Sequence, residues 1–259
     1  MGKQQTSNGL DLVLKKTAVY HKLQLVVDPE LDEALTDLNF IKRIDIDDQN
    51  VTITFHLPTY WCSPNFAFIM AEDIKKRVEE LDWVKRAEVI LIDHLESKKI
   101  SEGVSKGKTF KEVFGKSQGD LYELRQKFRL KAFYARQERL AKKLLNENVS
   151  KETIITMSII ELLYLSRTDK DIDQLVSRYL SIREEFDLST ESGAIAFTDP
   201  YGKKLAIDTF KEYFLNSKRE RLSMEFNSTF CQGILQTRYK DIETNRNLLI
   251  DEMMNDLPR

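Results

Sequence analysis

The sequence predicts an α+β fold in which a small N-terminal sheet domain precedes a mainly α-helical C-terminal domain. Three observations predict it. Two β-rich segments, 41–46 and 51–56, flank a short polar turn and form a hairpin pattern. A helical period over residues 65–81 leads into an apolar strand at 87–92. From about residue 120 onward, the pattern is helical almost throughout.

The N-terminal elements follow one another as helix, hairpin, helix and strand. Apolar residues recur near helical spacing from Leu12 to Val26. The helix is expected to end at Asp28–Pro29, because proline breaks a helix. The nine polar residues before them are expected to be loose. The turn of the hairpin is expected at Asp47–Asn50. Helices covering one face of a small sheet would form a compact domain over residues 11–94.

The rest of the chain divides into a linker and a helical domain. Residues 95–119 contain four of the nine glycines and are expected to form the linker. Residues 120–259 are expected to form the helical domain, and Asp199–Gly202 predicts a turn within a short hairpin near 194–207. Its helices are expected at 120–147, from Ser150 onward with Glu152 near the capping-box position, at 170–185, at 207–217 and at 219–240.

Composition excludes several classes of protein. Hydrophobic residues make up 41% of the chain and charged residues 32%, which is typical of a globular protein. The net charge of −2 makes nucleic acid an unlikely partner. No apolar run approaches the roughly 18 residues that a membrane span needs. The absence of a secretory apolar region predicts a cytoplasmic protein.

The thiol and imidazole content limits any metal site. The chain has two cysteines, Cys62 and Cys231, and three histidines, His21, His56 and His94. Two thiols cannot supply four cysteine ligands to an iron–sulfur cluster within one chain. A resident ferredoxin-like cluster is therefore not expected. A site within one chain would have to mix ligand types or recruit carboxylates.

Cys62 is the strongest candidate for a functional thiol. It lies in the run TYWCSP (59–64), directly before a predicted helix with Ser63 at the N-cap and Pro64 in the first turn. Unpaired amides and the dipole at a helix start favour the thiolate, which is the form that binds metal and attacks electrophiles. Thr59 could hydrogen-bond the sulfur. A buried cysteine that packs as a small hydrophobic residue is the alternative.

A second candidate element is the run DPEL (28–31), followed by DLNFI (37–41). From chemistry alone, Asp28 and Glu30 are either solvated turn residues at a helix end or carboxylate ligands. The turn interpretation is the more common outcome for such residues.

The two elements together resemble the metal–sulfur cluster assembly domain found in SufT and PaaD. That family has DPE followed by Leu or Ile, then a DLGL turn, a hairpin, and a TxxCP motif at a helix start. Residues of about 17–92 carry these elements in the same order and spacing. Two positions depart from the pattern: Asn39 replaces the glycine, although Asn also tolerates positive φ, and Ser63 separates Cys62 from Pro64.

The resemblance implies a function in metal-centre maturation. Cys62 would be the reactive thiol, binding iron or an iron–sulfur cluster transiently, and Asp28, Glu30 and Thr59 would line its pocket. The longer architecture is similar to proteins encoded beside bacterial soluble di-iron monooxygenases, which implies a di-iron hydroxylase as the client metalloprotein. Because one chain has few ligands, a bound cluster would bridge two chains in a homodimer, or bridge the chain and its client.

The remaining candidates lie near strand ends or in the helical half. Asp93 and His94 follow the last strand and could form a carboxylate–histidine pair or a metal ligand, although loop or cap residues are more common there. His56 ends the strand before Cys62 and could act as a base. Cys231 could pack in the helical core, or could face Cys62 and share one site with it.

Two other functions stay open at this point. Cys62 could be the nucleophile of an enzyme with His56 or His94 as its base, although an assembly factor without catalysis is favoured. The chain could also be a metal-free scaffold or chaperone, in which case Cys62 would be dispensable.

Overall fold

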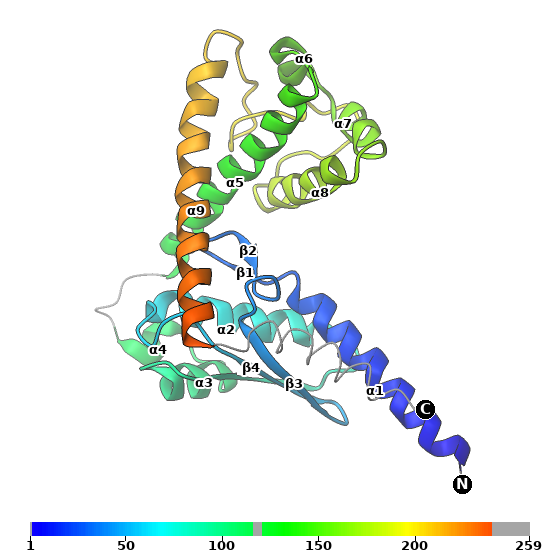
Figure 1. Cartoon of the computed structure of the whole chain (residues 1–259), viewed down its shortest axis with the longest axis vertical. Helices are drawn as coiled ribbons and strands as arrows, with labels where there is room; N and C mark the ends of the chain where they lie inside the picture. The colour runs from blue at the N-terminus through cyan, green and yellow to red at the C-terminus, as the bar shows by residue number, and fades with distance from the viewer. Residues whose placement is uncertain (1, 116–120, 240–259) are drawn as a thin grey trace. The chain divides into compact units, whose positions relative to one another are not determined.

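The computed structural model of this protein describes residues 2–115 and 121–239 (Figure 1). It divides into two compact units. The sheet unit contains the described residues up to Tyr122 together with residues 227–239. The helical unit contains Glu123–Phe226. The elements confirm the α+β fold class.

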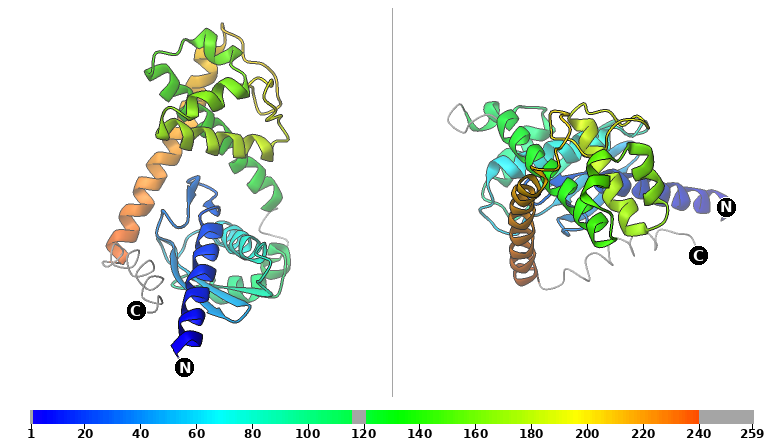
Figure 2. Two further views of the ribbon diagram at one scale, coloured as in Figure 1. Left: turned by 90° about the vertical axis from the view of Figure 1, so that its right-hand side faces the viewer. Right: turned by 90° about the horizontal axis from the view of Figure 1, so that it is seen from above.

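A three-stranded sheet forms the centre of the sheet unit (Figures 1 and 2). Its strands lie in the order β3–β4–β5. Strands β3 (Ile41–Asp47) and β4 (Asn50–Phe55) pair antiparallel, and Asp47 lies opposite Asn50. The turn between them is therefore tighter than the four polar residues suggested, and Asp48 adopts a φ of 54° there. Strand β5 (Arg86–Leu91) pairs parallel with β4, with helix α2 (Pro64–Glu79) as the crossover between them.

The core of the sheet unit follows the alternation of the strands. On β4, Val51, Ile53 and Phe55 are buried, while the residues between them are partly exposed. Helix α2 packs its apolar face on β5, and helix α1 (Gly2–Leu23) contacts both α2 and β3. Burial of these apolar side chains is the main source of stability of the unit.

The N-terminal helix differs from the prediction at both ends. It begins at Gly2 and ends at Leu23, before the proline that was expected to terminate it. Residues Val27–Asp28 instead form the short strand β1, which pairs antiparallel with β2 (Glu33–Ala34). Asp32 takes a φ of 55° in the connection between them.

The segment expected as a linker, 95–119, contains two helices. These are α3 (Ser97–Ser105) and α4 (Phe110–Phe114), and α3 packs on α2 and β5. Ile100, Val104 and Phe110 are buried in the same core as the sheet. Burial of these apolar side chains stabilises the two helices in spite of the glycines in the segment. The described part of the segment, up to Gly115, therefore belongs to the sheet unit.

The helical unit has its own core, centred on α5 (Leu121–Asn146) and α8 (Lys170–Glu185). The predicted second helix is two helices, α6 (Lys151–Thr156) and α7 (Ile159–Ser166). Ser158 begins α7 with a capping box to Glu161. At the start of α6, Ser150 accepts a hydrogen bond from the amide of Thr153, so Glu152 does not form the expected capping box.

The hairpin expected near 194–207 does not form regular strands. Among the described residues there, the pairing consists of two isolated bridges, Ser158 with Ile195 and Thr198 with Lys204. The turn at 199–202 is present, with the Gly202 amide donating to the Asp199 carbonyl at 3.0 Å. The physical reason is Arg183, whose guanidinium donates to the carbonyls of Ala196 at 2.6 Å and Ile195 at 3.2 Å. Those carbonyls are then not used for strand pairing.

The last two predicted helices are one continuous helix, α9 (Phe210–Arg238). Its first residues belong to the helical unit, whereas Asn227–Arg238 belong to the sheet unit. The sheet unit therefore takes residues that the sequence assigned to the helical domain 120–259. Within the described part of the chain, none of the helices combines the length and hydropathy that crossing a bilayer requires.

Candidate functional site

Asp28 begins a fixed turn that contains the DPE motif. Its Oδ1 accepts hydrogen bonds from the amides of Glu30 at 2.8 Å and Leu31 at 3.0 Å. Pro29 has no amide to donate, so this side chain satisfies the two amides that follow it. Asp28 is 7% exposed, and burial raises its pKa to about 6, against the lowering effect of those two amides. The group is a buried carboxylate and not a solvated turn residue.

The turn after this motif explains why Asn39 replaces glycine. Asn39 has a φ of 57°, in the left-handed region that Asn tolerates better than most residues. Its carbonyl accepts a hydrogen bond from His56 Nε2 at 2.9 Å. The expected tolerance of positive φ at this position is therefore confirmed, and the turn is tied to the loop that carries the thiol.

Cys62 lies in the loop between β4 and α2. The helix begins at Pro64 with Ser63 at the N-cap position, but the Ser63 side chain caps no amide. The sulfur of Cys62 lies 3.0 Å from Thr59 Oγ1, and the thiol is half-buried against the core of the sheet unit. A hydroxyl at this distance can donate to a thiolate and stabilise its charge.

His94 fixes the backbone of Cys62. Its Nδ1 accepts from the amide of Glu96 at 3.1 Å, so the proton is on Nε2, which donates to the Cys62 carbonyl at 2.8 Å. Both ring nitrogens are thus occupied by backbone groups. The Asp93 carboxylate accepts instead from the hydroxyl of Tyr239 at 3.0 Å, so Asp93 and His94 do not form a carboxylate–histidine pair.

His56 is buried, and its ring contacts other groups than the thiol. Its ring packs on Tyr239 with 4.2 Å between centroids, and burial lowers its pKa. Nε2 is used by Asn39, whereas Nδ1 is buried without a hydrogen-bond partner in the described structure. No hydrogen bond joins His56 or His94 to the sulfur of Cys62 in residues 2–115 and 121–239.

The end of α9 contacts the DPE turn, the start of the loop that carries Cys62, and the residues after β5. Asn227 Nδ2 donates to Glu30 Oε1 at 3.4 Å, and Arg238 donates to the carbonyls of Leu57 at 3.2 Å and Asp93 at 2.7 Å. Burial, followed by the charges of Asp28, Cys62 and Glu30, raises the pKa of Cys231 to about 11. Sequence reasoning missed the contacts of Arg238 and Tyr239, because no local pattern marks contacts between residues so far apart in the chain.

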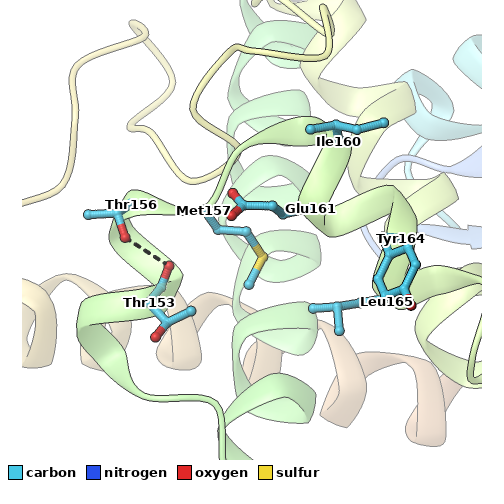
Figure 3. Close-up of a pocket in the computed structure, with 7 residues that line it drawn as sticks. All are labelled: Thr153, Thr156, Met157, Ile160, Glu161, Tyr164 and Leu165. Atoms are coloured by element: carbon cyan, nitrogen blue, oxygen red, sulfur yellow. Dashed lines mark hydrogen bonds between the residues drawn. The ribbon is translucent and has the colours of Figure 1, made fainter.

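The structure also contains a pocket of about 490 Å³ in the helical unit, formed by α6, α7 and the turn between them (Figure 3). Its charged lining group is Glu161, whose carboxylate already accepts from the amide and the hydroxyl of Ser158. The lining includes neither a thiol nor an imidazole. The pocket therefore does not contain the kinds of side chain that the sequence identifies as candidate ligands or bases at the thiol site.

The described residues do not contain a preformed metal cage. Within residues 2–115 and 121–239, no group of three or more His, Cys, Asp and Glu side chains is placed to hold a metal ion. The arrangement brings Cys62, Thr59, Asp28, Glu30 and Cys231 to one region of the sheet unit. It provides a half-buried thiol with a hydrogen-bonding hydroxyl and nearby carboxylates.

Comparisons with known proteins agree with this part of the chain. Residues 16–89 match the model of a family described as iron-sulfur cluster assembly protein. An uncharacterized protein of Methanocaldococcus jannaschii is 30% identical over 91 residues, which are 35% of this chain and 94% of that protein. No solved structure matches the chain. Through residues 16–89, the chain belongs to the iron-sulfur cluster assembly protein family.

Proposed function

We propose that this protein is an accessory maturation factor that helps to assemble an iron–sulfur cluster or a di-iron centre in a client metalloprotein. The observation that carries the proposal is the position of Cys62. The thiol lies just before α2, beside the Thr59 hydroxyl, within the segment 16–89 that matches a cluster assembly family. Iron or a cluster would be cargo that Cys62 binds and releases.

The buried carboxylate of Asp28 supports a functional site at this place. An asparagine could accept the same two amide hydrogen bonds without placing an ionisable group in the interior. The raised pKa shows that the folded protein disfavours the charged form. Retaining such a group at the expense of stability is typical of functional sites. Asp28 and Glu30 would complete or tune the pocket around the cargo.

Geometry favours a carrier thiol over a catalytic nucleophile. A cysteine nucleophile needs a base within hydrogen-bond reach of its sulfur. In the described structure, the hydrogen-bond partner of the sulfur is Thr59, and the nearby His94 binds the backbone. Thr59 would orient the sulfur, while His94 holds the loop in place.

The client we propose is the hydroxylase of a soluble di-iron monooxygenase. The support is the similarity of the long architecture, an assembly domain followed by helices, to proteins encoded beside such enzymes. The helical unit would contribute recognition of the client. A cluster held by Cys62 needs further ligands, which a second chain or the client would supply.

Maturation of a co-produced hydroxylase tests this function. A di-iron hydroxylase would be produced with the wild-type chain, with Cys62→Ala, with Ser63→Ala or without the chain, and its iron content measured after purification. Wild type and Ser63→Ala are expected to raise the iron per hydroxylase, because the Ser63 side chain caps no amide. Cys62→Ala is expected to match the sample without the chain. Full iron loading with Cys62→Ala would support a metal-free chaperone instead.

A further inference from the structure

The last turns of α9 present one continuous face to the sheet unit. Asn227, Cys231, Leu235 and Arg238 are spaced by four, four and three residues, which places them within about 80° of one another around a helix. Asn227 donates to Glu30, and Leu235 is 2% exposed in the core of the sheet unit. Arg238 donates to the carbonyls of Leu57 and Asp93.

This geometry fixes the direction in which Cys231 faces. It lies between a contact with the DPE turn on one side and a contact with the start of the Cys62 loop on the other. The Cys62 backbone is held by His94, which follows Asp93 directly, so the Arg238 contact lies beside the same loop. Cys231 packs against the same hydrophobic core as Cys62.

The carboxylate of Asp28 lies in the same region. Its Oδ1 accepts hydrogen bonds from the two amides of its turn, whereas Oδ2 receives no hydrogen bond from the described residues. The Asp28 side chain is 7% exposed, and its charge acts on the thiol of Cys231. Cys231 thus lies near a carboxylate oxygen that can still accept a hydrogen bond or bind a cation.

We propose that Cys231 is a second sulfur ligand, so that one chain holds its cargo between Cys62 and Cys231. The proposal rests on the proposed function and adds a ligand that lies outside the family segment 16–89. On loading with ferrous iron, each thiol gives its proton to solvent as its sulfur binds the metal. On loading with a preformed cluster, each thiol gives its proton to the small thiolate that it displaces, and neither exchange changes an oxidation state. The remaining iron valences would be filled by sulfide and a small thiol, and later by ligands of the client.

The two-thiol site has a consequence for assembly. A chain that binds with one thiol needs further ligands from a second chain or from its client, whereas a chain with two thiols can load as a monomer.

Anaerobic reconstitution of the full chain with ferrous iron, sulfide and dithiothreitol tests the second ligand. Iron per chain, absorbance and size in solution would be measured for wild type, Cys231→Ser, Cys62→Ser and, as a control, Gln236→Ala at an exposed position of α9. Wild type and Gln236→Ala, which keeps both thiols, are expected to load as monomers. Cys231→Ser is expected to lose several-fold of the iron per chain, or to load as dimers.

Equal loading of monomeric Cys231→Ser and wild type would overturn the second ligand. If Cys62→Ser were still unloaded in that experiment, the proposed function would stand and this inference alone would fail. Loading of Cys62→Ser to the wild-type level would instead contradict the proposed function. The two failures are therefore distinguishable.

A second measurement on the unaltered protein removes the dependence on a folded variant. Phenylarsine oxide bonds to two adjacent thiols, forming two As–S bonds and releasing one water molecule. The native chain is expected to take up one arsenical per monomer, with Cys62 and Cys231 both protected from alkylation in the peptide map. Uptake only after unfolding in urea, or only in dimers, would overturn the shared site.

Discussion

His94 donates from Nε2 to the carbonyl oxygen of Cys62 at 2.8 Å, and this bond joins the end of β5 to the loop that carries the thiol. The other ring nitrogen accepts from the amide of Glu96, so the ring bridges two backbone segments. The His94 side chain is 3% exposed, and both hydrogen bonds are partly buried. The position of the thiol thus depends on an imidazole that does not touch the sulfur.

Replacing His94 with Ala is expected to destabilise the sheet unit by about 2–4 kcal/mol, because a buried side chain is lost and a partly buried carbonyl and amide lose their partner. Both tryptophans, Trp61 and Trp83, lie in that unit, so urea unfolding followed by tryptophan fluorescence reports on it. His21→Ala, an exposed position on α1, serves as the control and should cost less than about 0.5 kcal/mol. Equal effects of the two changes would contradict the bridging role.

Thr59 is expected to control the reactivity of Cys62. Thr59→Val keeps the shape of the side chain but removes the hydroxyl 3.0 Å from the sulfur. A hydrogen bond to a charged group contributes about 1.5 kcal/mol or more, so alkylation of Cys62 by iodoacetamide at neutral pH should slow about tenfold. Thr59→Ser should react like wild type. Unchanged rates in the valine variant would show that the hydroxyl does not stabilise the thiolate.

Asp28→Asn is expected to stabilise the protein, with an effect that grows with pH. The pKa of Asp28 is raised from 3.8 to about 6 in the folded state, so its protonation favours folding below about pH 4. That contribution is lost as pH rises from about 4 through 6. The variant should therefore gain little at pH 4 and about 3 kcal/mol at pH 7 to 8.

Urea unfolding of Asp28→Asn at pH 4, 6 and 8 checks this linkage, with the exposed Asp37→Asn as control. The control should differ little from wild type at each pH. A variant that is less stable than wild type at pH 8 would mean that the carboxylate is needed for folding. The argument that it is retained for function would then fail.

Arg183→Met is expected to loosen the segment 189–198 of the helical unit. The guanidinium is 2% exposed and donates to the carbonyls of Ser189 at 2.8 Å and Ile195 at 3.2 Å, which would lose this donor. The cost should be about 3 kcal/mol or more. Hydrogen exchange of residues 189–198 should accelerate, while the exposed Arg167→Met should leave it unchanged. Equal exchange in both variants would contradict this role of Arg183.

Local patterns predicted the elements around the thiol well. The alternation of β4 and the period of α2 are set by neighbouring residues, so the sequence alone locates the loop between them and the Thr59–Cys62 pair. The prediction of two helices, 207–217 and 219–240, in place of the single helix α9 was wrong, and local residues also explain why α9 is continuous. Residues near Ser217 include no helix breaker, and the Ser217 hydroxyl bonds to the Tyr213 carbonyl one turn earlier within the helix.

Features that depend on distant residues could not be predicted in this way. The helices of segment 95–119 are stabilised by burial of Ile100 and Phe110 on the sheet, which outweighs the local glycine signal. The burial of Asp28 and the contacts of Tyr239 depend on how separate segments pack. Sequence identified Asp93 and His94 as candidates, but not that their side chains bind separate partners.

The most direct test of the central claim is cargo loading by Cys62. Wild type and Cys62→Ser would be reconstituted anaerobically with iron and sulfide under identical conditions, desalted, and compared by absorbance spectrum and bound iron per chain. We predict a visible sulfur-to-iron absorption band for wild type that is lost in Cys62→Ser, with the variant folded by circular dichroism. The same band and the same bound iron in folded Cys62→Ser would contradict the assignment of Cys62 as the thiol that carries the cargo.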